Sequence, residues 1–218
     1  MKILFFGDIH DDLDSIKLIQ KQEQADKAII TGDLTRYGGE PEAVKVIEVS
    51  KGISSNILAV VGNMDKKEID EYLSKIKINI HSKGIKLNSD LGIFGSGGSI
   101  PTPFHTPTEI PEQEYTSILE KGYNDIKDCR TKILVSHQPP FDTSVDKINM
   151  GMHVGSKVLR DFILECKPDL CVCGHIHEAQ GTDYLGETKI INTGISAKGY
   201  VCVEYDQKIL SAELILIS

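Results

Sequence analysis

The 218-residue sequence contains no apolar run that approaches the ~20 residues of a membrane-spanning helix. The segment from Met1 to Gly7 is too short for the apolar region of a secretory signal peptide, and it lacks a small-residue cleavage site. We therefore expect a cytoplasmic protein that does not contact a membrane. With 40% hydrophobic residues, the chain is long enough to bury a substantial core, and we expect a single domain over residues 1–218.

The sequence also lacks a disulfide framework and an excess of positive charge. The five cysteines are an odd number without framework spacing, which argues against a disulfide-stapled fold. Cys171 and Cys173 resemble half of a zinc site, but no second cysteine pair completes it, so we interpret them as buried free thiols. The formal net charge of −8 argues against an extended nucleic-acid-binding surface. It is compatible with a nucleotide held in a small pocket.

The first part of the chain alternates regularly between strand-like and helix-like segments. Residues 2–6 form a continuous apolar run, as expected of a strand that is buried on both faces. A helical pattern follows, and the same order repeats, which indicates a mostly parallel sheet with helical crossovers. We predict strands at 2–6, 28–30 and 57–61 and helices at 13–22, 41–50 and 66–75.

The second part of the chain has a different character. Segments 85–87 and 91–94 are joined by a tight turn and predict a hairpin, while residues 96–111 are rich in glycine and proline and lack periodicity. A structureless loop of this length in a compact domain is usually functional. We further predict helices at 112–128 and 156–166, strands at 132–135 and 170–173, and three strand-like runs between 188 and 217. The whole pattern indicates an α/β fold that ends in mixed or antiparallel β-structure.

Side chains that can bind metals follow five of the predicted strands. Ligands of open α/β sheets bind at the carboxyl ends of the strands, so this placement indicates one shared site. Each residue alone has a structural explanation, because Gly-Asp and Gly-Asn are ordinary turn dipeptides and a lone histidine usually has a structural hydrogen bond. Together they predict a metal site. The candidate ligands are Asp8, His10, Asp33, Asn63, His137, His175 and His177.

The chemistry of these ligands indicates two metal ions. Two carboxylates, one carboxamide and four imidazoles suit Mn, Fe, Zn, Ni or Co better than Cu(I) or Ca²⁺. The set is too large for one tetrahedral zinc with an open position, but it suits two ions that share a bridging carboxylate. Two ions ~3.5–4 Å apart can hold a bridging hydroxide and clamp a phosphoryl oxygen. We expect two divalent ions, manganese first, with Fe, Zn, Ni or Co as alternatives.

The motifs resemble those of the calcineurin-like metallophosphoesterases. The family pattern is D-x-H, G-D, G-N-H-[DE], [GS]-H and G-H-x-H, and this chain reads GDIH, GD, GNMD, SH and GHIH in the same order, from Asp8 to His177. The resemblance implies a four-layer α/β/β/α sandwich of two mixed sheets flanked by helices. It implies one ion on Asp8, His10, Asp33 and His177 and another on Asp33, Asn63, His137 and His175, with Asp33 as the bridge. Segments 97–104 and 151–156 further resemble a small prokaryotic phosphoesterase subgroup.

One position departs from the family pattern. The histidine that usually assists the leaving oxygen is replaced by Met64, which cannot donate a proton. We therefore predict a phosphodiesterase in which a metal-bridging hydroxide attacks the phosphate ester and Asn63 helps to orient the site. The alternatives are a phosphomonoesterase and a catalytically inactive, metal-stabilised binding scaffold. His153, just before an expected helix start at Ser156, is the candidate substitute for the missing histidine, with His105 second.

The loop at 96–111 supplies the candidate substrate-binding residues Gly98, Ser99 and Phe104. A glycine-rich backbone can offer N–H groups to a phosphate, and Phe104 can stack on a ring. A rigid surface loop, stiffened by its prolines, is an equally supported interpretation. The expected substrate is a small phosphate ester or a nucleotide. A homo-oligomer is compatible with the sequence.

Overall fold

The computed structural model describes residues 1–206 and 209–217. One sheet contains β1 (Lys2–Phe6), β2 (Lys27–Ile30), β3 (Ile57–Ala59), β10 (Gly199–Asp206) and β11 (Ile209–Leu216). The other contains β4 (Lys83–Lys86), β5 (Leu91–Ser96), β6 (Thr131–Ser136), β7 (Leu170–Cys173), β8 (Gly181–Leu185) and β9 (Thr188–Asn192). The helices are α1 (Leu13–Gln22), α2 (Glu40–Ser50), α3 (Lys67–Lys75), α4 (Glu112–Asp125) and α5 (Lys157–Cys166), with short 3-10 turns η1 (Ser144–Asp146) and η2 (His177–Ala179).

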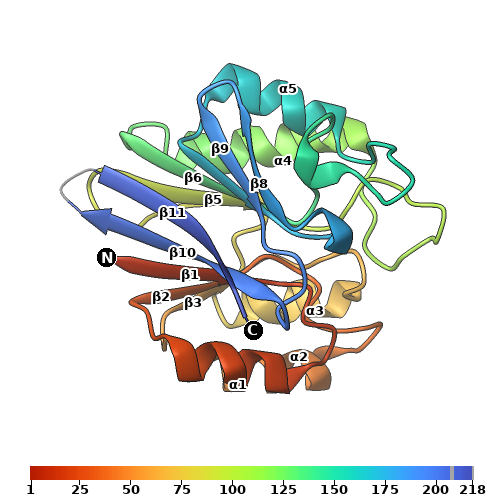
Figure 1. Ribbon diagram of the computed structural model, residues 1–218, viewed down its shortest axis with the longest axis vertical. Coiled ribbons are helices and arrows are strands. Elements are labelled where there is room, and N and C mark those ends of the chain that lie inside the picture. The colour runs from red at the N-terminus through yellow and green to blue at the C-terminus, as the bar shows by residue number, and fades with distance from the viewer. Residues whose placement is uncertain (207–208, 218) are drawn as a thin grey trace.

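These elements form four layers. Helices α1, α2 and α3 cover the outer face of the sheet with strand order β11-β10-β1-β2-β3 (Figure 1). Helices α4 and α5 cover the outer face of the sheet with strand order β4-β5-β6-β7-β9-β8, and the two sheets pack against each other. The predicted α/β/β/α sandwich is confirmed. Within the described part of the chain, no helix is long and apolar enough to cross a membrane.

The strand directions bring many strand ends to one side of the molecule. Strands β1, β2 and β3 are mutually parallel, as are β5, β6, β7 and β9. Antiparallel pairing brings in β10 and β11 in one sheet and β4 and β8 in the other. Consequently, the loops that follow the parallel strands of both sheets emerge together at one end of the sandwich (Figure 1).

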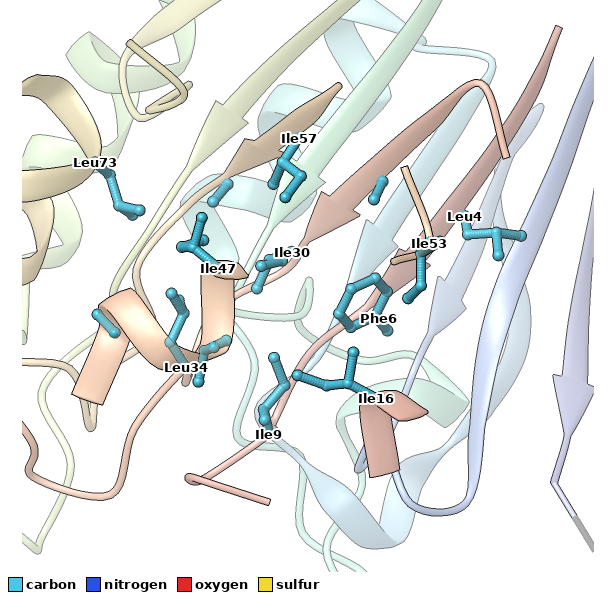
Figure 2. Close-up of a cluster of buried hydrophobic side chains, with 14 of the residues drawn as sticks. Leu4, Phe6, Ile9, Ile16, Ile30, Leu34, Ile47, Ile53, Ile57 and Leu73 are labelled. Carbon is cyan, nitrogen blue, oxygen red and sulfur yellow. The ribbon is translucent and has the colours of Figure 1, made fainter. Parts of the chain in front are cut away.

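Alternate side chains of the central strands fill two different cores. Ile3 and Phe5 of β1 pack between the two sheets, whereas Leu4 and Phe6 pack against the helices. Figure 2 shows Phe6 directed toward Ile16 of α1 on this helical side. Full burial of such a side chain contributes about 1.5–3 kcal/mol. The requirement for two apolar faces explains why the sequence of β1 is a continuous apolar run.

Most predicted elements are present, with differences at their ends. The predicted strand at 57–61 ends earlier, at Ala59, and the predicted helix at 112–128 ends at Asp125, because the chain turns at Ile126. β8 was not predicted, since it is an edge strand whose exposed and partly exposed positions alternate and leave no apolar run. The runs predicted between 188 and 217 are confirmed as β9, β10 and β11.

Candidate metal centre

The loops after β1 and β2 carry the first three candidate ligands. Their backbones continue the pairing of the two strands, because the N–H of Asp8 donates to the carbonyl of Gly32 at 3.0 Å and the N–H of Ile9 donates to that of Asp33 at 2.8 Å. The N–H of His10 also donates to the Asp33 carbonyl, at 3.1 Å. The sheet thus fixes the positions of these ligand side chains relative to one another.

Several candidate ligands have a left-handed backbone. The φ angles of Asp8, His10, Asp33 and His175 are 47°, 50°, 48° and 70°. Each such conformation costs a non-glycine residue about 1–3 kcal/mol, and such residues cluster at functional sites. The concentration of this strain on ligand residues marks the end of the sandwich as a site rather than a set of ordinary turns.

Two glycines of the motifs allow the ligands to approach closely. A Cβ atom on Gly62 would collide with Oδ1 of Asp33, and one on Gly174 would collide with Oδ2 of Asp8. These positions need glycine for space. The Gly-Asn and Gly-His dipeptides of the sequence therefore belong to the architecture of the site.

One group of ligand atoms converges around His177. Its Nε2 lies 3.1 Å from Oδ1 of Asp8 and 3.2 Å from Nε2 of His10. Asp8 also accepts hydrogen bonds from the backbone N–H of His175, at 3.0 and 3.2 Å, which joins the end of β1 to the end of β7 across the two sheets. Asp8, His10 and His177 thus present one ligand atom each to a common point.

A second group, Asp8, Asp33 and His137, lies beside the first and shares Asp8 with it. Oδ2 of Asp33 lies 3.7 Å from Nε2 of His10 and 3.6 Å from Nε2 of His137, between the two groups. Oδ1 of Asn63 lies 2.9 Å from the same nitrogen of His137. The rings of His137 and His175 meet edge to face, with centroids 5.1 Å apart. All seven predicted ligands are therefore brought together.

The hydrogen bonds of His137 show that the site fits a cation. Its Nδ1 lies 3.0 Å from the carbonyl oxygen of Thr31, which can only accept, so Nδ1 carries the proton. Burial lowers the pKa of His137, so the ring is neutral and its Nε2 presents a lone pair. This lone pair faces the Asn63 carboxamide oxygen, another acceptor. A divalent ion satisfies both atoms, and these nitrogen and oxygen donors suit first-row metals.

The carboxylates and imidazoles are also poised for metal binding. Burial and the neighbouring charges of Asp8 and Asp65 raise the pKa of Asp33 well above its ordinary value. Burial lowers the pKa of His10 to about 4 and that of His175 to about 3. These histidines are neutral at pH 7, as metal ligation requires. The Asp8 hydrogen bond raises the pKa of His177.

The match to a known family covers most of the chain. The family described as calcineurin-like phosphoesterase matches residues 1–179. The chain belongs to the calcineurin-like phosphoesterases. As a member of this family, it is a hydrolase of phosphate ester bonds, and the family works with two metal ions.

Two relatives by sequence were found. The chain is 36% identical over 214 residues to an uncharacterized protein of Methanocaldococcus jannaschii, and this alignment covers 95% of this chain and 93% of that protein. It is 24% identical over 156 residues to a probable cyclic nucleotide phosphodiesterase of Rhodopseudomonas palustris, and that alignment covers 68% of this chain and 56% of the relative. The first relationship spans nearly the full length of both chains.

Solved structures share the fold of this phosphoesterase. The protein TT1561 of Thermus thermophilus matches with a TM-score of 0.74 and 16% identity, over 98% of both chains. A dimetal phosphatase of Danio rerio matches with a TM-score of 0.68 and 8% identity, over 98% of this chain and 95% of that one. At these identities the similarity establishes the sandwich architecture.

Asp65 is a structural residue of the phosphoesterase site for which the sequence predicted no role. Its buried carboxylate accepts the backbone N–H groups of Leu34, Thr35 and Gly62 at 2.8–3.1 Å. Burial raises its pKa to about 6. Asp65 thereby ties the loop that carries Asp33 to the loop that carries Asn63. The sequence signal for Asp65 is the acidic fourth position of the family motif G-N-H-[DE].

The five cysteines are free thiols, as predicted, and none belongs to the ligand groups described above. Burial raises the pKa of Cys171 to about 12 and also raises that of Cys173 well above its ordinary value. A thiol that stays protonated is a poor metal ligand. Cys171 and Cys173 instead pack in the core beneath α4 and α5.

A cleft of about 960 Å³ opens beside the metal centre. Asn63, His175 and His177 form its polar end, and Met64, Phe104 and His153 also line it. Gly98 and Ser99 are not in its lining. Their N–H groups donate to the carbonyls of Val61 and Thr108, so they are not available to a phosphate. His105 is exposed and also lies outside the lining.

His153 is held by a buried carboxylate. Its Nδ1 lies 2.6 Å from Oδ1 of Asp146. The other ring nitrogen, Nε2, has no short hydrogen bond and lies 3.9 Å from Oδ1 of Asp142. Ser156 caps α5, as predicted. However, the first N–H groups of α5 donate to the carboxylate of Glu112, so the expected anion position at this helix start is already filled by the protein.

Proposed function

We propose that this phosphoesterase is a phosphodiesterase that works with two divalent ions, with manganese as the first choice and Fe, Zn, Ni or Co as alternatives. The observation that carries the proposal is the position of Met64, which lies in the cleft wall beside Asn63 where the family has a proton-donating histidine. A leaving group of low basicity needs little protonation. Aryl diesters therefore suit this site better than alkyl monoesters.

We further propose that the ligands divide between the two ions as the family resemblance implies. Asp8, His10, Asp33 and His177 would hold one ion, and Asp33, Asn63, His137 and His175 the other. The position of the Asp33 carboxylate between His10 and His137 supports its role as the bridge. When bound, the ions supply a nucleophile from water at neutral pH and neutralise charge on the phosphoryl oxygens.

The chain itself contributes orientation and a proton donor. The Thr31 carbonyl fixes the tautomer of His137, and the backbone N–H of Met64 orients Asp33 through a 2.8 Å hydrogen bond to Oδ1. The Asp146 carboxylate fixes His153 with Nδ1 bound. His153 then offers Nε2 to the leaving oxygen, in place of the histidine that Met64 replaces.

The relative from Rhodopseudomonas palustris, named as a probable cyclic nucleotide phosphodiesterase, supports the diester assignment. The substrate is a small phosphate ester or a nucleotide. We also propose a cytoplasmic location, because the free thiols of all five cysteines are typical of a reducing compartment.

A metal and substrate matrix tests the proposed function. Metal-stripped protein is reloaded with Mn, Ni, Co, Zn or Mg and assayed on p-nitrophenyl phosphate and bis(p-nitrophenyl) phosphate, which share one leaving group. We expect turnover only with metal, and a higher kcat/KM for the diester. Faster cleavage of the monoester would make the protein a phosphomonoesterase. Binding of two ions without turnover of either ester would identify an inactive scaffold.

A further inference from the structure

The cleft beside the metal centre is unusually apolar away from its ligand end. Two segments form its apolar walls: one contributes Ile100 and Phe104, and the other contributes Phe141, Ile148, Met150 and Met152. Phe104 is 81% exposed, Met150 80% and Met152 52%. Contiguous exposed apolar surface of this kind marks a binding site, whereas isolated exposed apolar residues do not.

Both apolar walls are built by ordered backbone. Met150 and Met152 lie at the tip of a hairpin in which Lys147 pairs with His153 and the N–H of Ile148 donates to the carbonyl of Met152 at 3.0 Å. Opposite them, the loop that carries Phe104 is organised around the Glu109 carboxylate. Both loops project from the ligand end of the sandwich (Figure 1). The exposed side chains are therefore displayed in defined positions.

Several polar groups in the walls of the cleft are committed to the protein itself. Gln138 donates to the carbonyl of Val154 and accepts from the N–H of Ile100, and the hydroxyl of Thr102 donates to Glu109. Glu112 accepts the N–H groups that begin α5. Recognition of a nucleobase requires free donors and acceptors at its edges. These walls offer mainly methyl, methylene and thioether surface.

We propose that the cleft binds an aliphatic chain, so that one of the two organic groups on the substrate phosphate is lipid-like. This inference rests on the proposed phosphodiesterase function. The cleft is continuous with the metal centre, so a phosphate held by the ligands would direct one ester group between the two walls. Flexible methionine side chains adapt to chains of different shape, and the volume of about 960 Å³ suits a large ligand.

A series of p-nitrophenyl phosphodiesters tests this assignment with a constant leaving group. The second ester group is methyl, butyl, hexyl or octyl, or the 5′-oxygen of thymidine, and all are used below micelle-forming concentrations. We expect kcat/KM to rise with chain length, by up to about fourfold for each methylene group buried. A flat chain-length dependence, a preference for the thymidine ester over the hexyl ester, or activation only above the micelle-forming concentration would overturn the assignment.

Matched variants locate the effect in the cleft. The double variant Met150→Gln/Met152→Gln keeps side-chain length but removes apolar character, and it should flatten the dependence on chain length. Leu18→Gln changes an exposed leucine of α1, 42% exposed and outside the cleft, and should keep the wild-type dependence. An unchanged dependence in the double variant would exclude these walls as the binding surface.

A binding measurement separates this inference from the proposed function. Calorimetric titration of the metal-loaded protein with methyl-, butyl-, hexyl- and octylphosphonate requires no turnover. Affinity that rises with chain length, without cleavage of any diester, would leave the cleft assignment standing and remove the phosphodiesterase. Cleavage of diesters, together with an affinity that does not depend on chain length, would support the phosphodiesterase function and overturn the assignment of the cleft.

Discussion

Asp33→Asn changes one charge at the centre of the metal site while keeping the size of the side chain. The carboxamide oxygen can still accept the 2.8 Å hydrogen bond from the N–H of Met64. Its effect on stability should have opposite signs with and without metal. In the metal-free protein, burial and the charges of Asp8 and Asp65 raise the pKa of Asp33, so folding disfavours its ionised form.

The sign of the metal-free effect follows from this raised pKa. At neutral pH the wild-type carboxylate destabilises the fold, and asparagine removes that cost. The advantage of the variant should shrink as the pH falls and vanish below the ordinary value of 3.8, where Asp33 is protonated in both states. A buried polar group whose pairing is incomplete costs about 1–3 kcal/mol. The melting temperature of the metal-free variant should therefore rise by roughly 2–12 °C.

In the metal-loaded protein the same substitution should remove the proposed bridge. We expect a loss of at least about 10²-fold in kcat, because even the outer partners of metal ligands contribute about 10–100-fold. His177→Ala should lose less, since it removes one terminal imidazole. Asp169→Asn is the control, because Asp169 also accepts a backbone N–H but lies at the opposite end of β7.

The assays are thermal unfolding with chelator or added Mn²⁺, metal content by mass spectrometry, and turnover of bis(p-nitrophenyl) phosphate. If Asp33→Asn keeps two ions and near-native turnover, Asp33 is not the bridge. If the metal-free variant melts below the metal-free wild type, the charge argument is wrong. The two conclusions are independent of each other.

Other substitutions test the proton donor, the cleft and the metals. Met64→His should raise kcat/KM for esters with alkyl leaving groups by up to about 10²–10⁴-fold, with little effect on esters with aryl leaving groups. An equal effect on both kinds of ester would contradict the argument from the leaving group. His153→Ala should keep both ions and lower kcat most for poor leaving groups, whereas loss of metal would show that His153 supports the ligands. Phe104→Ala should raise KM at constant kcat, and an unchanged KM on every cleavable ester would show that Phe104 does not contact the substrate. Removal of the ions by a chelator should lower the free energy of unfolding by about 2.7 kcal/mol, compared with protein that is saturated with an ion at 100 times its Kd. Denaturant unfolding measures this difference.

The fold and the clustering of the candidate ligands could be predicted because both depend on short-range sequence features. Residues that directly follow a buried strand are positioned by the sheet, as the hydrogen bonds from Asp8 and Ile9 to the next loop show. A continuous apolar run such as that of β1 also reports its own burial on two faces. The strand, the glycine and the candidate ligand are neighbours in the sequence, so the motif specifies where the ligand lies relative to the sheet.

Features formed between distant loops could not be predicted in this way. Glu112 fills the start of α5 from 45 residues away along the chain, which removed the anion position expected beside His153. The N–H groups of Gly98 and Ser99 are committed to Val61 and Thr108, a pairing that composition does not reveal. The apolar cleft likewise exists only because the hairpin of Met150 and the loop of Phe104 face each other.

The candidate metal site combines several unfavourable arrangements. Four ligand residues have left-handed backbones, two carboxylates are buried side by side, and the Nε2 of His137 faces the carboxamide oxygen of Asn63. The same fold compensates with the sheet pairing of the 8–10 and 32–34 loops and the three backbone hydrogen bonds to Asp65. Bound ions would remove the repulsions but leave the backbone conformations unchanged. Metal binding and the stability of these loops would therefore be linked, because bound ions and the Asp65 carboxylate would both hold the Asp33 loop to the Asn63 loop.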